Sequence, residues 1–230
     1  ERVPEGCSQK VFVTGNPVRD SVLALTDLAY VGPQSGEPFR VLVFGGSQGA
    51  RVFSQMLPQA IAGLPDGLRS RLRLEQQCRP EDIEAVRAEY TKMGVQAELA
   101  TFFNDMGARL TRAHLVVCRA GASTVTELLA LGRPALLVPY PFAMDDHQSA
   151  NARILSQKGA AIAVAEKGLT AQTLAETLAG LSAQPSRLTS LAQSAKAMGR
   201  LNAAAALADL AEGLADGRSL AETRARLESV

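Results

Sequence analysis

Short runs of apolar residues alternate along the chain with longer segments in which apolar residues recur at helical spacing. The runs are continuously apolar, which is typical of strands buried on both faces of a parallel sheet. Seven such runs are KVFVTG, VLVFGG, RLRLEQQC, QAELATFF, HLVVCRAG, ALLVPYP and AAIAVAE. Between them we expect helices at about residues 50–63, 80–93, 104–112, 123–131, 146–158 and 170–182. This alternation predicts an α/β fold with a doubly wound, Rossmann-like parallel sheet.

The two ends of the chain follow other patterns. Residues 33–38, PQSGEP, have the composition of a linker, and SVLALTDLA before them predicts a short helix. From Pro185 onward the chain is Ala-rich and helical, with breaks expected near Gly213 and Gly217 and a capping box in SLAE at 219–222. This tail contains no strand, so its apolar positions need a partner surface.

Composition excludes several classes of protein. Lys and Arg number 24 against 23 Asp and Glu, so the net charge of +1 gives no general attraction to nucleic acid or to anionic membranes. Any anion must therefore be bound locally. Three widely separated cysteines, Cys7, Cys78 and Cys118, show no disulfide or zinc spacing and suit a reducing, cytoplasmic compartment. The sequence has neither a signal-peptide pattern nor an apolar run of the roughly 18 residues that suggest a membrane span.

In an open parallel sheet, ligands collect beyond the carboxyl ends of the strands. The first loop of interest there is Gly45–Gly49, GGSQG, which matches neither the dinucleotide nor the P-loop pattern. It is either a tight turn capped by Ser47 or an anion site at the start of the following helix.

A second loop, CRAGASTVTELLALG at 118–132, again joins a strand to a helix, which we expect to begin at about Ser123. Thr124 and Glu127 have the spacing of a capping box, in which the glutamate accepts a backbone N–H. Alternatively, this helix start faces a phosphate and Glu127 accepts hydrogen bonds from a ribose diol. Two helix starts facing one diphosphate would offset much of its charge without a metal.

A third loop, VPYPFAMDDHQSANARIL at 138–155, contains Asp145, Asp146, His147 and Gln148. These residues permit three interpretations: metal ligands, a solvated helix start with an aspartate cap, or polar groups that read sugar hydroxyls. Arg19 in GNPVRDS follows a strand end and a Gly-Asn-Pro turn. It is either an ordinary surface arginine or a cation beside the two anion sites.

Four segments, TGNPVR, GGSQGAR, CRAGASTVTE with LGRPALLVPYP, and DDHQSANA, together resemble the C-terminal half of the MurG family of UDP-N-acetylglucosamine:undecaprenyl-pyrophosphoryl-muramoyl-pentapeptide N-acetylglucosaminyltransferases. The resemblance covers about residues 10–212, in the family's order. It implies one of the two Rossmann-like domains of a GT-B fold, the domain that holds the sugar nucleotide. The implied reaction is inverting transfer of N-acetylglucosamine from UDP to lipid I, which forms lipid II in peptidoglycan synthesis. We expect no cofactor and no resident metal.

The resemblance assigns residues to the donor, UDP-N-acetylglucosamine. The diphosphate would lie against Arg19 and Ser47, with Gln48 beside them, and the base near Phe103 in TFFNDM, whose family counterpart reads uracil through its backbone. His147 and Gln148 would read the hydroxyls of the sugar. Phosphate, ribose and sugar would be contacted by Ala122, Ser123, Thr124, Val125, Thr126 and Glu127, with Glu127 on the ribose.

The family's glycine-rich loop and acceptor-side histidine are not in this sequence, so we expect no catalytic residue in the chain. The undecaprenyl-linked acceptor and the inner face of the cytoplasmic membrane would then be contacted through a missing N-terminal domain. We expect residues 1–18 to be a remnant of that domain, 19–38 a linker, 39–184 the UDP-sugar domain and 185–230 a helical tail, exposed near Leu201 to Leu214 and prone to dimerise. The alternatives are the donor half of another UDP-sugar transferase, or one chain of a split transferase.

Overall fold

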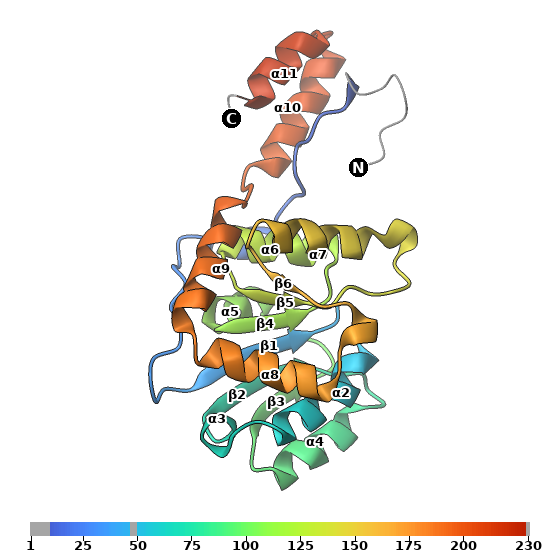
Figure 1. Cartoon of the computed structure of the whole chain (residues 1–230). Helices are drawn as coiled ribbons and strands as arrows, with labels where there is room; N and C mark the ends of the chain where they lie inside the picture. Colours follow the sequence, from blue (N-terminus) through green and yellow to red (C-terminus); the bar gives the residue numbers. More distant parts are fainter. Residues whose placement is uncertain (1–9, 47–49, 229–230) are drawn as a thin grey trace.

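Six parallel strands form one sheet in the order β3-β2-β1-β4-β5-β6 in the computed structural model, which describes residues 10–46 and 50–228 (Figure 1). All five strand pairs are parallel, and the order reverses between β1 and β4. The predicted doubly wound α/β sheet is therefore confirmed. The strands are β1 Phe39–Phe44, β2 Leu72–Gln77, β3 Gln96–Ala100, β4 Leu115–Cys118, β5 Ala135–Leu137 and β6 Ile162–Ala163.

Helices cover both faces of the sheet. The α-helices are α1 Asp20–Leu23, α2 Arg51–Ala62, α3 Asp66–Arg69, α4 Ile83–Lys92, α5 Met106–Arg112, α6 Ala122–Leu131, α7 His147–Gln157, α8 Ala171–Ser182, α9 Pro185–Ala197, α10 Ala203–Ala215 and α11 Leu220–Glu228. Two short 3₁₀ helices are η2 Met144–Asp146 and η3 Glu166–Gly168. No helix in the described part of the chain is long and apolar enough to cross a membrane.

Two separate cores explain why the central strand β1 is almost continuously apolar. Val41 and Val43 of β1 point into a core with α2, α4 and α8, while Leu42 and Phe44 point into a second core with α1, α5, α6 and α7. Because successive strand residues face opposite sides, both sets must be apolar when helices cover both faces. Burying one such side chain contributes about 1.5–3 kcal/mol.

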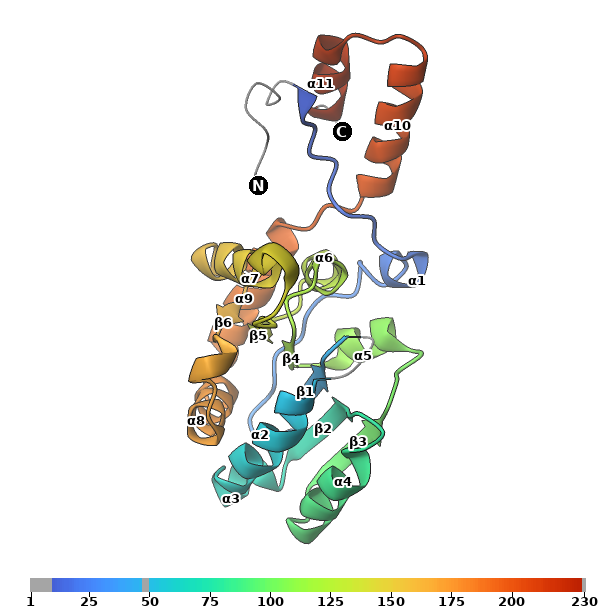
Figure 2. The same cartoon turned by 90° about the vertical axis from the view of Figure 1, so that its right-hand side faces the viewer.

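The first predicted strand, KVFVTG, is wrong. Residues 11–19 form no strand, and this segment lies away from the sheet and runs beside α10 (Figure 2). Arg200 donates a hydrogen bond to the carbonyl of Val13 at 3.0 Å, and a Cβ on Gly15 would lie 3.0 Å from Ala203. A strand requires a hydrogen-bonded neighbour, and among the described residues no strand lies beside this segment.

The C-terminal helices divide into two groups. α9 packs against α6 and α8, and its Leu188 and Leu191 join the first core. α10 and α11 instead extend away from the sheet domain (Figures 1 and 2). Leu201, just before α10, and Leu207 and Leu214 within it are 44%, 48% and 47% exposed, which confirms the exposed apolar surface predicted for the tail.

The predicted helix break at Gly213 is also wrong, because α10 continues through it to Ala215. A Cβ at Gly213 would lie 2.6 Å from the guanidinium of Arg218, so the glycine permits a close approach rather than ending the helix. The other predicted break is correct, since Gly217 follows the helix with a φ of +78°. The capping box before α11 is confirmed, because Glu222 accepts from the backbone N–H of Ser219 at 3.0 Å and the Ser219 hydroxyl accepts from the N–H of Glu222 at 3.2 Å.

Candidate functional site

Side-chain amides connect the loops that follow the strands at the carboxyl edge of the sheet. Gln77, at the end of β2, accepts a hydrogen bond from the N–H of Gly45 at 3.2 Å and donates to the carbonyl of Thr101 at 3.1 Å. It therefore ties the start of the glycine-rich loop after β1 to the loop after β3. Sequence analysis missed Gln77, although a buried polar residue at a strand end is the signal that identifies it.

Gln148 and Asn151 perform the same role for β4 and β5. The Gln148 side-chain oxygen accepts from the N–H of Ala120 at 3.1 Å and from the N–H of Tyr140 at 3.0 Å. Asn151 donates to the carbonyl of Ala120 at 2.9 Å. The amide NH₂ group of Gln148 has no partner among residues 10–46 and 50–228, so it remains free to donate to a ligand.

The start of α6 has no side-chain cap. The helix begins at Ala122, one residue before the expected start, with Gly121 as its N-cap, and Ala122 and Ser123 in the first turn are exposed. The first N–H groups of a helix lack intrahelical partners and carry the positive end of the helix dipole. The capping-box interpretation of Thr124 and Glu127 is wrong, because both residues lie inside the helix and Glu127 binds elsewhere.

Glu127 forms a bidentate ion pair with Arg19. The Arg19 Nε and Nη2 donate to the two carboxylate oxygens at 2.6 and 2.9 Å, and this pair raises the pKa of Arg19. The Glu127 side chain is 10% exposed and that of Arg19 is 59% exposed. Beside the pair, Asn16 donates to the hydroxyl of Thr126 at 3.2 Å. The pair thus joins the segment before α1 to the second turn of α6, 108 residues away in sequence.

The remaining predicted residues of α6 differ in what they offer a ligand. Thr124 and Thr126 are partly exposed, and the Thr126 hydroxyl donates to the carbonyl of Ala122 at 2.8 Å. Val125 is 8% exposed and packs in the second core, so its side chain serves the fold. Ligand contact at Val125 would therefore have to involve its backbone.

His147 begins α7 and is exposed. Its Nδ1 donates to the carbonyl of Met144 at 2.7 Å, which fixes the ring and leaves Nε2 facing no partner in the described part of the chain. Asp145 and Asp146 before it have φ values of 51° and 53°, a left-handed conformation that costs about 1–3 kcal/mol per residue. Asp146 does occupy the N-cap position, but its side chain makes no capping hydrogen bond. Among the described residues, no group of three or more His, Cys, Asp and Glu is placed to hold a metal.

Phe103 is 5% exposed, and its ring lies under the guanidinium of Arg109, whose central carbon is 3.9 Å from the ring centre. The next side chain toward the N-terminus, Phe102, is 60% exposed. The ring of Phe103 is therefore part of the fold, and the only contact it leaves for a ligand is through its backbone. Phe102 was not among the predicted site residues.

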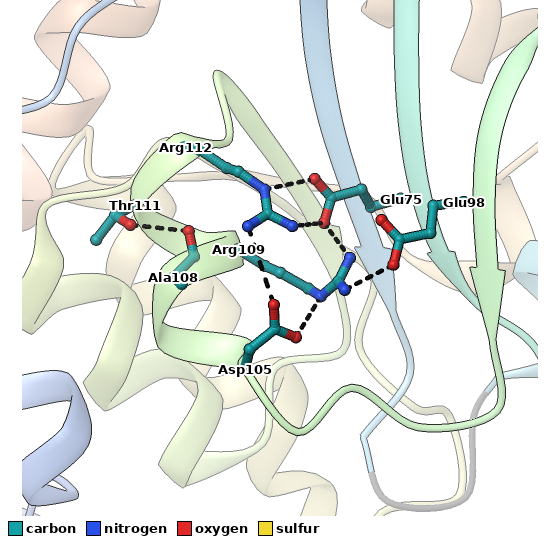
Figure 3. Close-up of polar contacts among 7 residues, drawn as sticks. All are labelled: Glu75, Glu98, Asp105, Ala108, Arg109, Thr111 and Arg112. Atoms are coloured by element: carbon teal, nitrogen blue, oxygen red, sulfur yellow. Dashed lines mark hydrogen bonds and ion pairs between the residues drawn. The ribbon is translucent and has the colours of Figure 1, made fainter.

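An ion-pair cluster holds Arg109 in this position (Figure 3). Its three guanidinium nitrogens contact Glu75 of β2 at 2.5 Å, Glu98 of β3 at 2.7 Å and Asp105 at 2.6 Å. These hydrogen bonds lower the pKa values of Glu98 and Asp105. Arg112 adds two hydrogen bonds of 2.8 Å to Glu75. The cluster fixes the loop between β3 and α5, and with it the backbone at Phe103.

Two predicted donor residues, Ser47 and Gln48, lie outside the described residues. The structure does place Gly45, Gly46 and Ala50 on either side of them at the carboxyl end of β1. Hydrogen bonds join these elements at one sheet edge, since Arg19 pairs with Glu127 of α6 and Gln148 of α7 accepts from Ala120 just before α6. That edge combines an uncapped helix start, a cation and free hydrogen-bond donors.

Comparison with known proteins identifies the family. Residues 40–212 match the model of the glycosyltransferase family 28 C-terminal domain. The chain is 55% identical over 206 residues to a protein of Rhodospirillum rubrum named UDP-N-acetylglucosamine--N-acetylmuramyl-(pentapeptide) pyrophosphoryl-undecaprenol N-acetylglucosamine transferase, covering 90% of this chain and 53% of that protein. An Agrobacterium fabrum protein of the same name is 48% identical over 223 residues, covering 97% of this chain and 59% of its own length.

A solved structure, that of MurG from Acinetobacter baumannii, superposes with a TM-score of 0.70 at 33% identity, covering 79% of this chain and 54% of that one. This chain spans little more than half the length of the curated relatives it matches. Sequence and structure agree on the resemblance inferred from the four motifs. The chain belongs to glycosyltransferase family 28, and residues 40–212 form its C-terminal domain.

Proposed function

We propose that this chain binds UDP-N-acetylglucosamine as the donor half of an inverting N-acetylglucosaminyltransferase. The observation that carries the proposal is the Arg19–Glu127 pair beside the uncapped start of α6. A cation and a helix N-terminus both favour a diphosphate, and a carboxylate favours a ribose diol. The relatives at 48–55% identity are named for this donor.

Arg19 and Glu127 can keep their ion pair while they bind the donor. Arg19 uses Nε and Nη2 for the pair, so Nη1 remains for a phosphate oxygen. A carboxylate has about four acceptor positions, so Glu127 can accept from ribose hydroxyls in addition to Arg19. The ion pair then orients the guanidinium and the carboxylate. The ligand binds between this pair and the start of α6 without breaking the pair.

The uracil would meet the loop after β3. Its hydrogen bonds would be made by the backbone near Phe103, whose ring is buried, while the exposed ring of Phe102 is available for stacking on the base. The sugar would lie near the start of α7, where the Gln148 amide and the His147 Nε2 face its hydroxyls. Ser47 and Gln48 would complete the diphosphate site.

The acceptor and the chemical step belong to the whole protein in this proposal. The relatives' name specifies a pyrophosphoryl-undecaprenol acceptor, and transfer from UDP would give inversion if an acceptor hydroxyl attacks opposite the leaving diphosphate. No residue of this chain is assigned as the general base. Donor binding would stabilise the departing UDP through Arg19 and the α6 dipole, which is electrostatic catalysis by preorganised groups. The enzyme would work at the inner face of the cytoplasmic membrane.

Calorimetric titration of the chain with UDP tests the proposal. We expect saturable heat release, and replacement of Arg19 by Ala to weaken UDP binding about tenfold, because a charge-assisted hydrogen bond contributes roughly 1.5–3 kcal/mol. Arg187→Ala removes the same charge from an exposed position of α9 and is the matched control. Absence of heat and of any thermal shift at millimolar UDP would contradict the proposal.

A further inference from the structure

A groove of about 900 Å³ lies beside the candidate donor site and shares Gly45, Gly46 and Gln148 with it. It is lined by the glycines Gly45 and Gly46, by Gln148, and by residues of α2 and of the loops that follow β5 and β6. Val52, Met56 and Leu169 in its wall pack on the core under α2 and α8. Val18 and Val125, next to Arg19 and near Glu127, pack in the core of the opposite face. The groove and the Arg19–Glu127 pair therefore lie toward opposite faces of the sheet.

The groove is strongly basic. Four cations line it, Arg51, Arg79, Arg119 and Lys167, against one carboxylate, Glu166. Glu166 is paired with Arg119 at 2.5 Å and Arg79 with Glu81 at 3.7 Å, which leaves two of the four cations, Arg51 and Lys167, for a ligand. Arg51 and Lys167 are exposed and form no ion pair with any residue that the structure describes. This charge is complementary to a compact polyanion such as a diphosphate.

One wall of the groove is an exposed aromatic loop. Phe142 is 81% exposed and Tyr140 is 43% exposed, and their rings meet edge to face with centroids 5.7 Å apart. Met144, 80% exposed, follows in the same loop. Adjacent exposed apolar side chains of this size indicate a surface that binds an apolar partner.

Buried Arg119 holds this loop in place. It is 8% exposed, and it donates to the carbonyls of Val138 and Pro139 at 3.1 Å each, while its guanidinium lies 5.3 Å from the ring centre of Tyr140. The N–H of Tyr140 is fixed by Gln148. The aromatic wall is thus built on a rigid base, so its exposure is a property of the fold.

We propose that this groove binds a lipid diphosphate, with the diphosphate on Arg51 and Lys167 and the first apolar units of the chain on Phe142 and Tyr140. The inference rests on the proposed function, because it makes the groove the part of the acceptor site that this domain contributes. Gly45, Gly46 and Gln148 line the groove and also border the donor site. A transferase must bring donor and acceptor together in this way for the reacting atoms to meet.

Calorimetry with geranyl diphosphate, a short soluble isoprenyl diphosphate, tests the inference on the chain saturated with UDP. We expect geranyl diphosphate to bind while UDP is present, and inorganic pyrophosphate to bind about tenfold more weakly because it lacks the apolar contact with the aromatic wall. Displacement of geranyl diphosphate by UDP would overturn the inference, since it would place the ligand in the donor site.

Variants at Phe142 and Lys167 test the contributions of the apolar chain and of the diphosphate separately. Phe142→Ser should weaken geranyl diphosphate about tenfold and leave pyrophosphate unchanged, whereas Phe142→Leu should retain most of the affinity. Lys167→Ala should weaken both ligands about fivefold through loss of one charged contact. Lys92→Ala, at the end of α4 on the opposite edge of the sheet, is the matched control and should change nothing. UDP affinity should be the same in all four variants.

Three further outcomes decide whether the groove inference, the proposed donor function or both fail. If UDP binds and geranyl diphosphate does not, the inference fails and the proposed donor function stands. If UDP does not bind, the proposed function fails, and the same variants titrated without UDP still decide whether the groove takes a lipid diphosphate. Binding to phosphatidylglycerol vesicles that depends on Phe142, without binding of geranyl diphosphate, would contradict the inference and identify a membrane-surface contact.

Discussion

Arg19 and Arg109 both pair with carboxylates on the same side of the sheet, and the difference between them separates binding from folding. Arg109 is 9% exposed in its side chain and places all three guanidinium nitrogens on carboxylates from β2, β3 and the loop before α5. Arg19 is 59% exposed and meets one carboxylate, Glu127. Arg109 is buried among its carboxylates and out of a ligand's reach, whereas Arg19 is exposed and keeps Nη1 for a ligand.

The comparison also explains how the two clusters cooperate. The Arg109 cluster fixes the loop after β3, where the base is proposed to lie, and the Arg19–Glu127 pair lies beside α6, where the diphosphate and ribose are proposed to lie. One cluster therefore supports the loop that is proposed to meet the base, and the other would contact the proposed donor directly. Variants of the first should reduce stability, and variants of the second should reduce affinity.

The largest expected effect is on stability, at Arg109. Arg109→Met should lower the free energy of unfolding by about 3 kcal/mol, because it leaves three carboxylates without their shared cation. Arg112→Met is the matched control, since Arg112 is 39% exposed and its loss should cost no more than about 1 kcal/mol. Urea unfolding followed by circular dichroism measures both. Equal losses for the two variants would contradict the distinction between a buried cluster and a surface pair.

A smaller effect is expected on affinity, at Glu127. Glu127→Ala should weaken UDP binding about tenfold by calorimetry, because charged hydrogen bonds contribute roughly 1.5–3 kcal/mol. The affinity for 2′-deoxy-UDP should fall less, because only the ribose offers the complete diol. Equal losses for the two nucleotides would show that Glu127 acts only by holding Arg19.

A third effect depends on pH and arises at His114. Its Nδ1 accepts the N–H of Arg40 at 3.1 Å, and burial followed by the charge of Arg40 lowers its pKa. The neutral form is favoured in the folded state, so its contribution to stability is present above the unfolded pKa of about 6.5 and is lost as pH falls toward the folded value. Chemical unfolding at pH 7.5 and 5.5 should show a loss of stability that His114→Gln reduces.

The acidic groups of the Arg109 cluster respond at lower pH. The pKa values of Glu98 and Asp105 are lowered by hydrogen bonds from Arg109, so their contribution is complete above the unfolded values near 4 and disappears as pH falls below them. Arg109→Met should remove this acid-dependent step and leave the step due to His114. Persistence of the acid step in Arg109→Met would contradict the assigned pairs.

The smallest effect on stability is expected in the tail. Leu207→Glu on α10 should change the free energy of unfolding by less than about 0.5 kcal/mol, because Leu207 is 48% exposed and lies away from the sheet. It should nevertheless shift the chain from dimer to monomer in sedimentation velocity experiments, if the exposed leucines associate as predicted. A wild-type chain that stays monomeric at high concentration would contradict that association.

Local sequence patterns predicted the sheet correctly. They failed where the structure depends on a partner residue far away in the sequence. Six of the seven runs became strands, because helices on both faces bury apolar residues on both sides of the central strands, whereas β2 and β3 carry Glu75 and Glu98 on one face. KVFVTG has the same pattern without a neighbouring strand to pair with. The capping-box spacing of Thr124 and Glu127 failed for a related reason, since the partner of Glu127 is Arg19, far away in the sequence.

The site residues were predicted from sequence motifs. The residues that were missed belong to no such motif. Arg19 and Glu127 were assigned separately to phosphate and ribose, but nothing in the sequence indicated that they pair. Gln77 and Asn151 connect loops through single amides, which leave no spacing signature. The ion pairs of Arg109 could be predicted only from the strand register, because Glu75 and Glu98 become neighbours only when β2 and β3 align.

Amide chemical-shift mapping of the chain by NMR during titration with UDP tests the central claim most directly. We expect the largest shifts at Gly45 and Gly46, at residues 101–103 and at residues 121–127, with no change in α10 and α11. We also expect the side-chain Nε of Arg19 to shift while it remains hydrogen-bonded to Glu127. Shifts confined to the tail, or spread over the sheet without a maximum at its carboxyl edge, would contradict a donor site built on the Arg19–Glu127 pair.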